Sequence, residues 1–403
     1  MARRVVVTGL GAVASTGMNV PAFWEAATSG KSGIKSDTIV AGEDLKITAP
    51  MARIEGFDDV AADLGRDIAR TDNFTKFAVV ASDEAIEDAG LHFSDEMRTR
   101  TATIIGTGIG GQEAMNTAYI GMLTKGKRAH PLTILKTIPN AAASQLSIRH
   151  GLTGPAFAVS SACASGAHAI GVTAELIKSG AADIGVTGAS EAVLTYGSLE
   201  AWKAMHILSS DQCRPFSKNR NGLVIGEGAG ILVLEEYDHA RARGAKVYAE
   251  LVGFGMNADG KDMINPAVEG AAGAMSLALN GIDQPAASEI YINAHGTGTL
   301  MNDPTETKAI REVFGAGADD LIVSSTKSMH GHLLGAAGGV ETIMAIKALE
   351  TGIVPPTINF EEPDPECDLN ITPNEAQERS LSLTLSNSFA FGGLNAVVAF
   401  ARI

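Results

Sequence analysis

Cys163 stands between an apolar segment and a helical pattern, in the stretch AFAVSSACASGAHAIGVTAELIKSG of residues 156–180. The apolar run predicts a buried strand, and the periodicity that follows predicts a helix. A thiol at such a turn would lie at a helix N-terminus, where free N–H groups and the helix dipole favour the thiolate and lower its pKa. Small neighbouring residues would let an acyl carbonyl reach the sulfur. The stretch is compatible with a nucleophile for acyl transfer and equally with an inert buried cysteine.

Three histidines follow two later apolar segments. His295 stands at the exit of the strand expected in IYINAHGTGT of residues 290–299, and His330 and His332 follow Lys327 in LIVSSTKSMHGH of residues 321–332. A single histidine at a strand end is more often structural than catalytic. Cysteine catalysis, however, needs imidazole partners that converge from distant parts of a chain. One cysteine at a strand-to-helix turn and two strand-exit histidine segments therefore indicate a catalytic site.

The elements that would position these side chains alternate between strand and helix patterns, which predicts an α/β fold with buried mixed sheets. The expected elements include a strand over 3–8, a helix over 21–29, surface loops over 35–65, a helix over 72–88 and helices within 114–150 that break at Pro131 and Pro139. From about residue 246 the order of strands and helices repeats that of the first half. We therefore expect two tightly packed halves, 1–245 with the cysteine and 246–403 with the histidines.

Composition bounds the function classes. The chain has 403 residues, 45% of them hydrophobic, with a net charge of −15. This charge argues against nucleic-acid and anionic-membrane partners, and no apolar run approaches the ~18 residues that span a bilayer. Cys163, Cys213 and Cys367 are far apart, which favours neither a disulfide framework nor a metal site and makes a reducing cytoplasm the default location.

Four ordered motifs carry a resemblance: SSACASG, NAHGTGT, SSTKSMHGHLLGAAGG and SNSFAFGGLNA. The chain resembles the β-ketoacyl-[acyl-carrier-protein] synthases, above all the type II elongating (FabF-like) branch with its nodulation protein E relatives. The resemblance implies a five-layered α-β-α-β-α thiolase-like fold with duplicated halves. It also implies a decarboxylating Claisen condensation in fatty-acid elongation, in which an acyl-enzyme and malonyl-[acyl-carrier protein] give a 3-oxoacyl-[acyl-carrier protein].

The resemblance assigns roles to residues of this chain. Cys163 matches the nucleophile, His295 and His332 match the two catalytic histidines, and Lys327 matches the family lysine. The remaining matches are Glu341 as the partner of Lys327, the N–H groups of Cys163 and Phe391 as the oxyanion hole, Phe391 with Gly392 and Gly393 as a gate, Thr297 and Thr299 as pantetheine contacts, and Ile109 as a wall of the acyl pocket.

The implied partners are an acyl carrier protein and the malonyl and acyl thioesters that it delivers. No cofactor is expected, because phosphopantetheine arrives on the carrier. An acidic carrier would need a local basic patch on this acidic chain, for which the candidates are Arg66, Arg70, Lys127 and Arg128. The resemblance implies a homodimer, with a heterodimer with a cysteine-less paralogue as the alternative.

Three departures from the family pattern leave the pathway open. His330 stands where threonine is usual, Leu394 replaces a threonine behind the gate, and His206 replaces an arginine that helps to hold the carrier. They favour altered chain-length or carrier preference. The alternatives are a specialised ketosynthase for nodulation-factor acyl chains, polyenes or polyketides, and a non-catalytic chain-length partner subunit. Degradative thiolysis is disfavoured, because SNSFAFGG lacks the second cysteine of thiolases.

Overall fold

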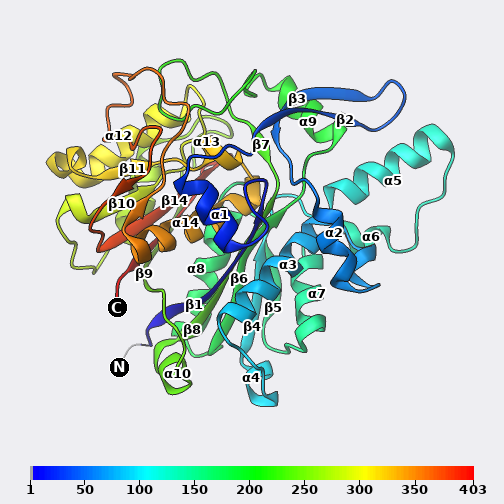
Figure 1. The fold of residues 1–403 in the computed structure, drawn as a ribbon, viewed down its shortest axis with the longest axis horizontal. Helices are drawn as coiled ribbons and strands as arrows, with labels where there is room; N and C mark the ends of the chain where they lie inside the picture. The colour runs from blue at the N-terminus through cyan, green and yellow to red at the C-terminus, as the bar shows by residue number, and fades with distance from the viewer. Residues whose placement is uncertain (1–2) are drawn as a thin grey trace.

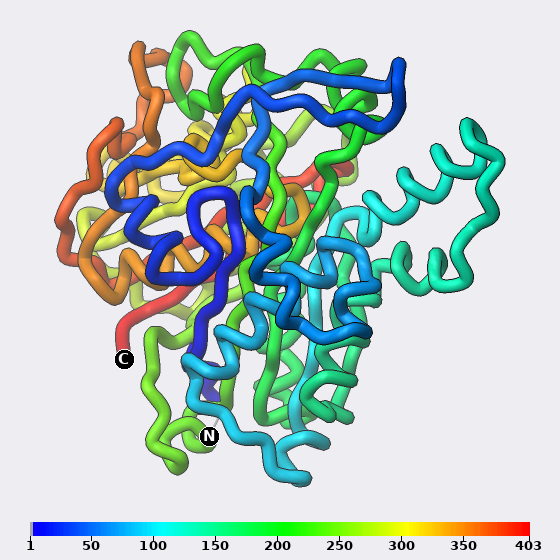
Figure 2. The backbone as a smooth tube through the Cα atoms, turned by 45° about the vertical axis from the view of Figure 1, so that its right-hand side comes forward, coloured from blue at the N-terminus to red at the C-terminus, as the bar shows by residue number. Residues whose placement is uncertain are grey.

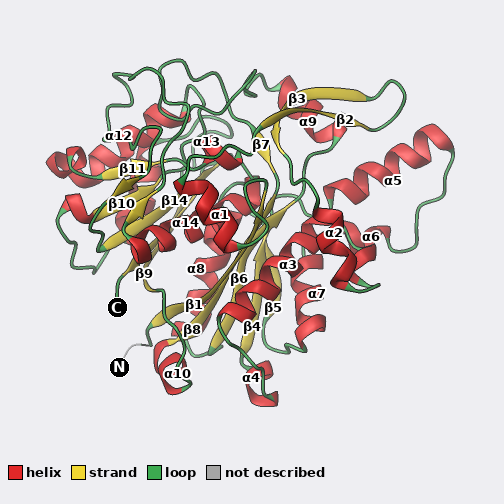
Figure 3. Ribbon diagram, in the orientation of Figure 1, coloured by secondary structure: helices red, strands yellow, loops and turns green. Residues whose placement is uncertain are grey.

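Ten strands form one continuous sheet through the molecule in a computed structural model that describes residues 3–403. In spatial order they are β11 (Ile322–Ser324), β10 (Ile290–Asn293), β14 (Leu383–Ala390), β15 (Leu394–Ala401), β9 (Ala249–Ala258), β1 (Val5–Ala14), β8 (Gly228–Glu236), β6 (Ile184–Glu191), β4 (Thr101–Gly106) and β5 (Ala156–Val159). Figure 1 shows these strands running through the body, and Figure 3 shows the helices that cover them.

The two halves of this sheet repeat one topology. β1, β4, β5, β6 and β8 occupy the same relative places as β9, β10, β11, β14 and β15. The strand directions also agree, since β6 pairs antiparallel with β8 as β14 does with β15, and β4 pairs parallel with β6 as β10 does with β14. The halves meet where β1 pairs with β9, at Val6 opposite Glu250 and Val7 opposite Ala249.

Helices form three layers around the two half-sheets, which gives the predicted five-layered thiolase-like fold. α3 (Asn73–Asp88) and α7 (Ala141–His150) cover the first half-sheet, and α11 (Val268–Ala278) and α12 (Asn302–Phe314) cover the second. α8 (Ser165–Lys178) and α14 (Ala337–Thr351) lie between the halves and contact strands of both. α14 is buried on almost all sides, because both half-sheets pack against it.

The strand that begins the chain is longer than predicted. β1 continues through Gly9 and Gly11 to Ala14, whereas a strand over 3–8 was expected. A Cβ atom at Gly11 would lie 1.8 Å from the carbonyl oxygen of Ala81 on α3, and one at Gly9 would lie 2.1 Å from that of Ala85. The glycines therefore do not end the strand. They let α3 lie directly against it.

The remaining helices include the one expected over 21–29 and those within 114–150 with breaks at Pro131 and Pro139, and also α2 (Phe57–Ala61), which lies where only loops were expected. They are α1 (Val20–Thr28), α2, α4 (Asp95–Thr99), α5 (Gln112–Lys125), α6 (Thr133–Thr137), α9 (Tyr196–Ala204), α10 (Tyr237–Ala242) and α13 (Lys327–His330). In Figures 1 and 2, α5 and α6 form an arm that projects from the body. Among the described residues, none of the helices combines the length and the apolar character needed to cross a bilayer.

The expectation of loops over 35–65 is wrong. β2 (Lys35–Val40) and β3 (Lys46–Ala52) form an antiparallel hairpin, and β3 also pairs with β7 (Ile225–Gly226). Only Ile47, Met51 and Ala52 of this hairpin are buried, so its apolar periodicity is too weak to be read from the sequence. β12 (Ile353–Val354) and β13 (Gln377–Glu378) form a further small pair.

Candidate active site

The candidate nucleophile lies at a tight turn between the two half-sheets. Cys163 follows a strand, β5, and precedes the first turn of α8, as predicted, and only 4% of its surface is exposed. The expectation that this strand is buried is wrong, because β5 is the edge strand of the sheet and Ala156 and Phe157 on it are exposed. Ala162 has a φ of 48°, in the left-handed region that residues other than glycine rarely adopt. The Ser165 hydroxyl braces the turn, because it donates to the Ala162 carbonyl at 2.7 Å and accepts from the Ser161 N–H at 2.9 Å. The site thus holds a strained backbone that presents the thiol.

His332 contacts the thiol in a defined tautomer. Its Nε2 lies 3.1 Å from Sγ of Cys163, and its Nδ1 accepts a hydrogen bond from the Leu334 N–H at 3.2 Å. Because a neutral imidazole carries one proton, that proton sits on Nε2 and points at the sulfur. The backbone of Phe391 also hydrogen-bonds the thiol. Two donors therefore converge on the atom that becomes negative when the thiol ionises.

The expectation that the helix N-terminus lowers the thiol pKa is wrong for this buried state. Burial raises the pKa of Cys163 to about 12, and the positive charge of Lys327 only partly opposes the rise. A thiolate loses its hydration at this depth, which costs more than the helix dipole returns. Ionisation of this thiol therefore depends on the nearby hydrogen-bond donors.

His295 stands beside His332, on a loop whose backbone N–H groups donate to the carboxylates of Glu306 and Asp303. The two imidazole centres are 5.4 Å apart and nearly perpendicular. Glu306 accepts the backbone N–H groups of His295 and Gly296, each at 2.8 Å. Burial first, and Lys327 second, lower the pKa of both histidines well below the usual value. Both rings are therefore neutral, and each carries one N–H that can donate a hydrogen bond.

Lys327 forms a buried ion pair beneath the histidines. Its Nζ lies 2.5 Å from Oε1 of Glu341, and both side chains are fully buried. Burial raises the pKa of Glu341 to about 7, while the charge of Lys327 opposes the rise. The pair places a fixed positive charge near both imidazoles and the thiol, which favours neutral rings and an ionised sulfur.

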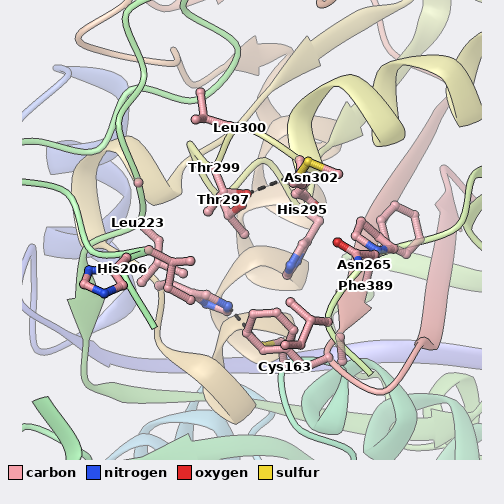
Figure 4. A pocket seen from close by; sticks show the side chains of 18 of the residues that line it. Cys163, His206, Leu223, Asn265, His295, Thr297, Thr299, Leu300, Asn302 and Phe389 are labelled. Carbon is pink, nitrogen blue, oxygen red and sulfur yellow. Dashed lines mark hydrogen bonds between the residues drawn. The ribbon is translucent and has the colours of Figure 1, made fainter. Parts of the chain in front are cut away.

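A cavity of about 260 Å³ leads from these groups toward the surface. Figure 4 shows Cys163 at its inner end, the His295 ring directed toward the sulfur, and Thr297 and Thr299 further out. The two threonine hydroxyls lie 2.9 Å apart. The cavity thus combines an apolar wall with a few polar groups, as expected for an extended acyl or thioester chain.

Phe391 lines the same cavity at the start of a glycine turn. Gly392 and Gly393 have φ values of 83° and 68°, which glycine adopts without strain. The Gly392 N–H donates to the carbonyl of Met263 at 2.8 Å, so the turn contacts the loop after β9. Phe391 therefore sits where a small change in two glycines would move it.

Family comparisons agree with this geometry. The family described as "Beta-ketoacyl synthase, N-terminal domain" matches residues 2–240, and "Beta-ketoacyl synthase, C-terminal domain" matches residues 248–361. The chain belongs to the β-ketoacyl synthases. Nodulation protein E of Rhizobium sp. (strain N33) is 44% identical, with 100% of both chains covered. 3-Oxoacyl-[acyl-carrier-protein] synthase 2 of Staphylococcus aureus (strain N315) is 41% identical, with 99% of this chain and 98% of that protein covered.

A solved structure extends the comparison. The chain matches a structure titled "AntDE:AntF (apo): type II PKS acyl-carrier protein in complex with its ketosynthase bound to the hexaketide" with a TM-score of 0.89, 32% identity and complete coverage of both chains. The shared fold over both chains agrees with the thiolase-like architecture described above.

The sequence-predicted site residues do not all line the same cavity. Cys163, His295, His332, Phe391 and the two threonines line one cavity. Ile109 does not line it. It is 40% exposed in the loop after β4, and its place in the acyl pocket stays a prediction.

The four candidate docking cations are exposed, at Arg66, Arg70, Lys127 and Arg128. Lys127 and Arg128 share a surface hollow of about 320 Å³ with Lys76 and Lys136. They therefore sit on the projecting arm and beside α3, away from the cavity that holds Cys163.

The three departures lie in different places. His206 is exposed at the cavity mouth with a φ of 56°. Leu394 is partly buried behind the gate. His330 is buried behind Lys327, where Nδ1 donates to the Gly331 carbonyl at 2.8 Å and Nε2 lies 3.0 Å from the Thr326 hydroxyl. It does not line the cavity.

Sequence reasoning missed several residues of the site. Asn265, Leu300, Met301 and Asn302 line the outer cavity. Asp303, on α12 with Glu306, accepts the N–H groups of Thr297 and Gly298 at 3.1 and 3.2 Å. Two acidic residues three positions apart, just after a glycine-rich histidine loop, were the available signal for this support.

Proposed function

We propose that this chain catalyses the decarboxylating condensation of an acyl-enzyme with malonyl-[acyl-carrier protein], with Cys163 as the nucleophile. The contact between the Nε2–H of His332 and the sulfur, 3.1 Å long, carries the proposal. It stabilises a thiolate without placing a second charge beside it. A structural cysteine would have no need of such a donor at the end of an open cavity.

The first half-reaction loads the enzyme. The Cys163 sulfur attacks the carbonyl carbon of an acyl thioester, its proton is taken up by the departing carrier thiol, and an S-acyl bond replaces the S–H bond. The developing oxyanion accepts hydrogen bonds from the backbone N–H groups of Cys163 and Phe391. Each such donor lowers the free energy of the transition state by about 3 kcal/mol.

The second half-reaction uses the two neutral imidazoles. The malonyl carboxylate leaves as CO₂, and its bonding pair becomes the enolate of the thioester. His295 and His332 donate hydrogen bonds to the enolate oxygen, because both residues line the cavity. Their lowered pKa values keep both rings neutral. The enolate carbon then attacks the acyl-cysteine carbonyl carbon, and the C–S bond breaks. Cys163 is released as a thiolate, and the complete 3-oxoacyl chain remains on the carrier.

Polar groups along the outer cavity suit the pantetheine arm. Its amides need both donors and acceptors, which Thr297, Thr299, Asn265 and Asn302 supply. The chain needs no resident cofactor for this chemistry, because the phosphopantetheine arrives with the carrier. The acyl carrier protein is therefore the proposed partner, docked through the exposed cations of the loop between α5 and α6 and of the segment before α3.

A homodimer is the proposed assembly. β5 is the last strand of the sheet, and Phe157 on it is 40% exposed. The α5–α6 arm exposes Tyr119, Leu123, Ile134 and Leu135 by 54–84%. An unpaired strand edge with adjacent apolar side chains favours association. Sedimentation of the wild type and of Phe157→Lys tests this, and a monomeric wild type would refute it.

For the pathway we propose fatty-acid elongation, in the reducing cytoplasm. The alternative is a specialised ketosynthase, which the 44% identity to a nodulation protein E and the departures at His206 and Leu394 favour. Chain preference separates the two, because a specialised enzyme would load an unusual acyl chain better than common saturated ones.

Intact-mass spectrometry of the wild type and Cys163→Ala tests the reaction and the pathway together. Each protein is incubated with acyl carriers of several chain lengths and saturation states, and malonyl carrier is then added. We expect an acyl adduct on the wild type alone, discharged as a 3-oxoacyl carrier two carbons longer. No adduct from any chain would overturn the nucleophile assignment and favour a non-catalytic partner subunit.

A further inference from the structure

Glu191 is a buried carboxylate that the reaction scheme above does not use. It is the last residue of β6, it is fully buried, and among the described residues no lysine or arginine forms a salt bridge with it. Burial raises its pKa to about 7, although hydrogen-bond donors oppose the rise. A buried acid without a counter-charge is costly, so its position calls for an explanation.

Four hydrogen bonds from two separate segments end on this carboxylate. They come from the Thr107 hydroxyl (3.1 Å), the Gly108 N–H (2.6 Å), the Ile109 N–H (3.3 Å) and the Gly335 N–H (3.0 Å). The first three donors belong to the loop after β4, and the fourth follows the histidine segment. Glu191 therefore ties a loop of the first half to the turn that carries His332.

The two segments approach the carboxylate so closely that only glycine fits. A Cβ atom at Gly108 would lie 2.8 Å from Oε2 of Glu191, and one at Gly335 would lie 2.6 Å from it. A Cβ atom at Gly335 would also lie 2.2 Å from the Gly108 nitrogen. The carboxylate, the loop and the turn thus form one closely packed unit.

The turn that Glu191 anchors also determines which ring nitrogen of His332 carries the proton. Leu334 has a φ of 47°, a left-handed conformation that costs a leucine about 1 kcal/mol or more. This conformation aims the Leu334 N–H at Nδ1 of His332, and the next N–H, that of Gly335, ends on Glu191. The anchored turn therefore keeps the His332 proton on Nε2, which faces Cys163.

We propose that Glu191 is a positioning residue for His332, acting through the Leu334–Gly335 turn. A carboxylate suits this role because it only accepts, and all four groups around it only need an acceptor. This role rests on the proposed function only because it assumes that the His332–Cys163 contact serves catalysis. The experiment below measures the effect of that contact on the thiol, so this role of Glu191 can be refuted while the condensation itself is confirmed.

Glu191→Asp is the deciding variant. It keeps the negative charge and draws the carboxylate back by one methylene, about 1.5 Å, so that Gly335 loses its anchor. Glu227→Asp is the matched control. Glu227 is also a buried carboxylate with a pKa raised to about 7, and it accepts from the Ile54 N–H at 3.1 Å. Among the described residues, no hydrogen bond joins its carboxylate to the turn that carries His332, although the neighbouring Gly226 N–H donates to the His332 carbonyl.

The readout is the rate of Cys163 alkylation by iodoacetamide as a function of pH, together with kcat and KM. Without the aimed Nε2–H the thiolate is less stable, so we expect the apparent thiol pKa of Glu191→Asp to rise. Each unit of rise slows alkylation about tenfold at neutral pH. We also expect kcat to fall while KM stays within about twofold, since the contact matters most where charge develops. Glu227→Asp should leave the thiol pKa unchanged.

A double variant shows the route of the effect. In a His332→Ala background, Glu191→Asp should change the alkylation profile no further, because both act through one contact. An additive effect, a fall of the thiol pKa, or a Glu191→Asp profile equal to that of Glu227→Asp would overturn the proposal. Thr107→Val removes one donor to the carboxylate and keeps the side-chain shape, so it gives the same readout if Glu191→Asp fails to fold. We expect a smaller rise in the same direction, and no rise would overturn the proposal.

Discussion

Lys327 and Glu341 face each other across 2.5 Å in the interior, with both side chains fully buried. Replacing Lys327 by Met would leave Glu341 without its counter-charge. Removal of one partner of a buried pair costs about 3–5 kcal/mol. We expect Lys327→Met to lower the free energy of unfolding by this amount in urea titrations.

The same variant separates stability from chemistry when it is paired with Glu341→Gln. The double variant buries no charge, so we expect it to recover most of the stability. It should not recover activity, because the positive charge that favours neutral imidazoles and an ionised thiol is gone. A double variant that regains both would show that the pair serves the fold alone.

His330 provides a stability prediction with a defined sign. Burial lowers its pKa to about 3, whereas an unfolded histidine titrates near ~6.5. Between these values the unfolded chain binds more protons, so stability falls as the pH falls below about 6.5. At pH 5 the loss attributable to this residue is about 2 kcal/mol. His330→Thr should therefore lose about 2 kcal/mol less than the wild type between pH 7 and pH 5.

Urea unfolding at the two pH values measures this difference. Other titrating groups are common to both proteins and cancel in the comparison. The matched control is His92→Thr, since His92 is exposed. Parallel pH curves for the wild type and His330→Thr would contradict the assignment of His330 as a buried neutral ring.

The fold and the central chemistry of this chain were predictable because their signals are local. Strong apolar runs predicted the strands that precede Cys163 and His295, and four motifs placed the thiol, the imidazoles and Lys327 at one site. The hairpin over 35–52 was missed, because β2 buries none of its residues and takes its place from pairing with β3. Its register depends on contacts with β7, far away in the sequence.

The thiol pKa and the role of Glu191 could not be predicted for a different reason. The pKa of Cys163 depends on how deeply the turn is buried, which no single segment determines. Glu191 ends an ordinary apolar strand, and only the assembled structure brings it to the backbone N–H groups of Gly108 and Gly335. Such convergence of distant segments leaves no periodicity in the sequence.

The close contact between β1 and α3 predicts that one added methyl group in β1 sharply lowers the free energy of unfolding. A Cβ atom at Gly11 would lie 1.8 Å from the Ala81 carbonyl oxygen, so the strand or the helix must move. Overpacking of this kind costs about 3 kcal/mol, and we expect Gly11→Ala to lose this amount in thermal or urea unfolding. Gly42→Ala is the control, because its Cβ atom would have its nearest neighbour at 3.5 Å. Equal stability of the two variants would contradict the close packing.

The cations of the arm predict a difference between two kinds of substrate. Lys127 and Arg128 are exposed on a chain with a net charge of −15, so an acidic carrier needs such a local patch to dock. Reversing both to Glu should raise KM for acyl and malonyl carriers about tenfold at low ionic strength, and less at high salt. The KM for a small CoA thioester, which does not need the carrier surface, should stay unchanged.

A charge-matched pair makes this measurement specific to the arm. Arg241→Glu with Lys178→Glu changes the net charge equally at partly or largely exposed side chains of α10 and α8. We expect these variants to leave KM for the carrier nearly unchanged, since screening limits the reach of exposed charges to about 10 Å at 0.1 M salt. Equal rises of KM for carrier and CoA substrates in the Lys127 and Arg128 variants would refute the patch. Equal rises in both pairs of variants would instead show that only the net charge matters.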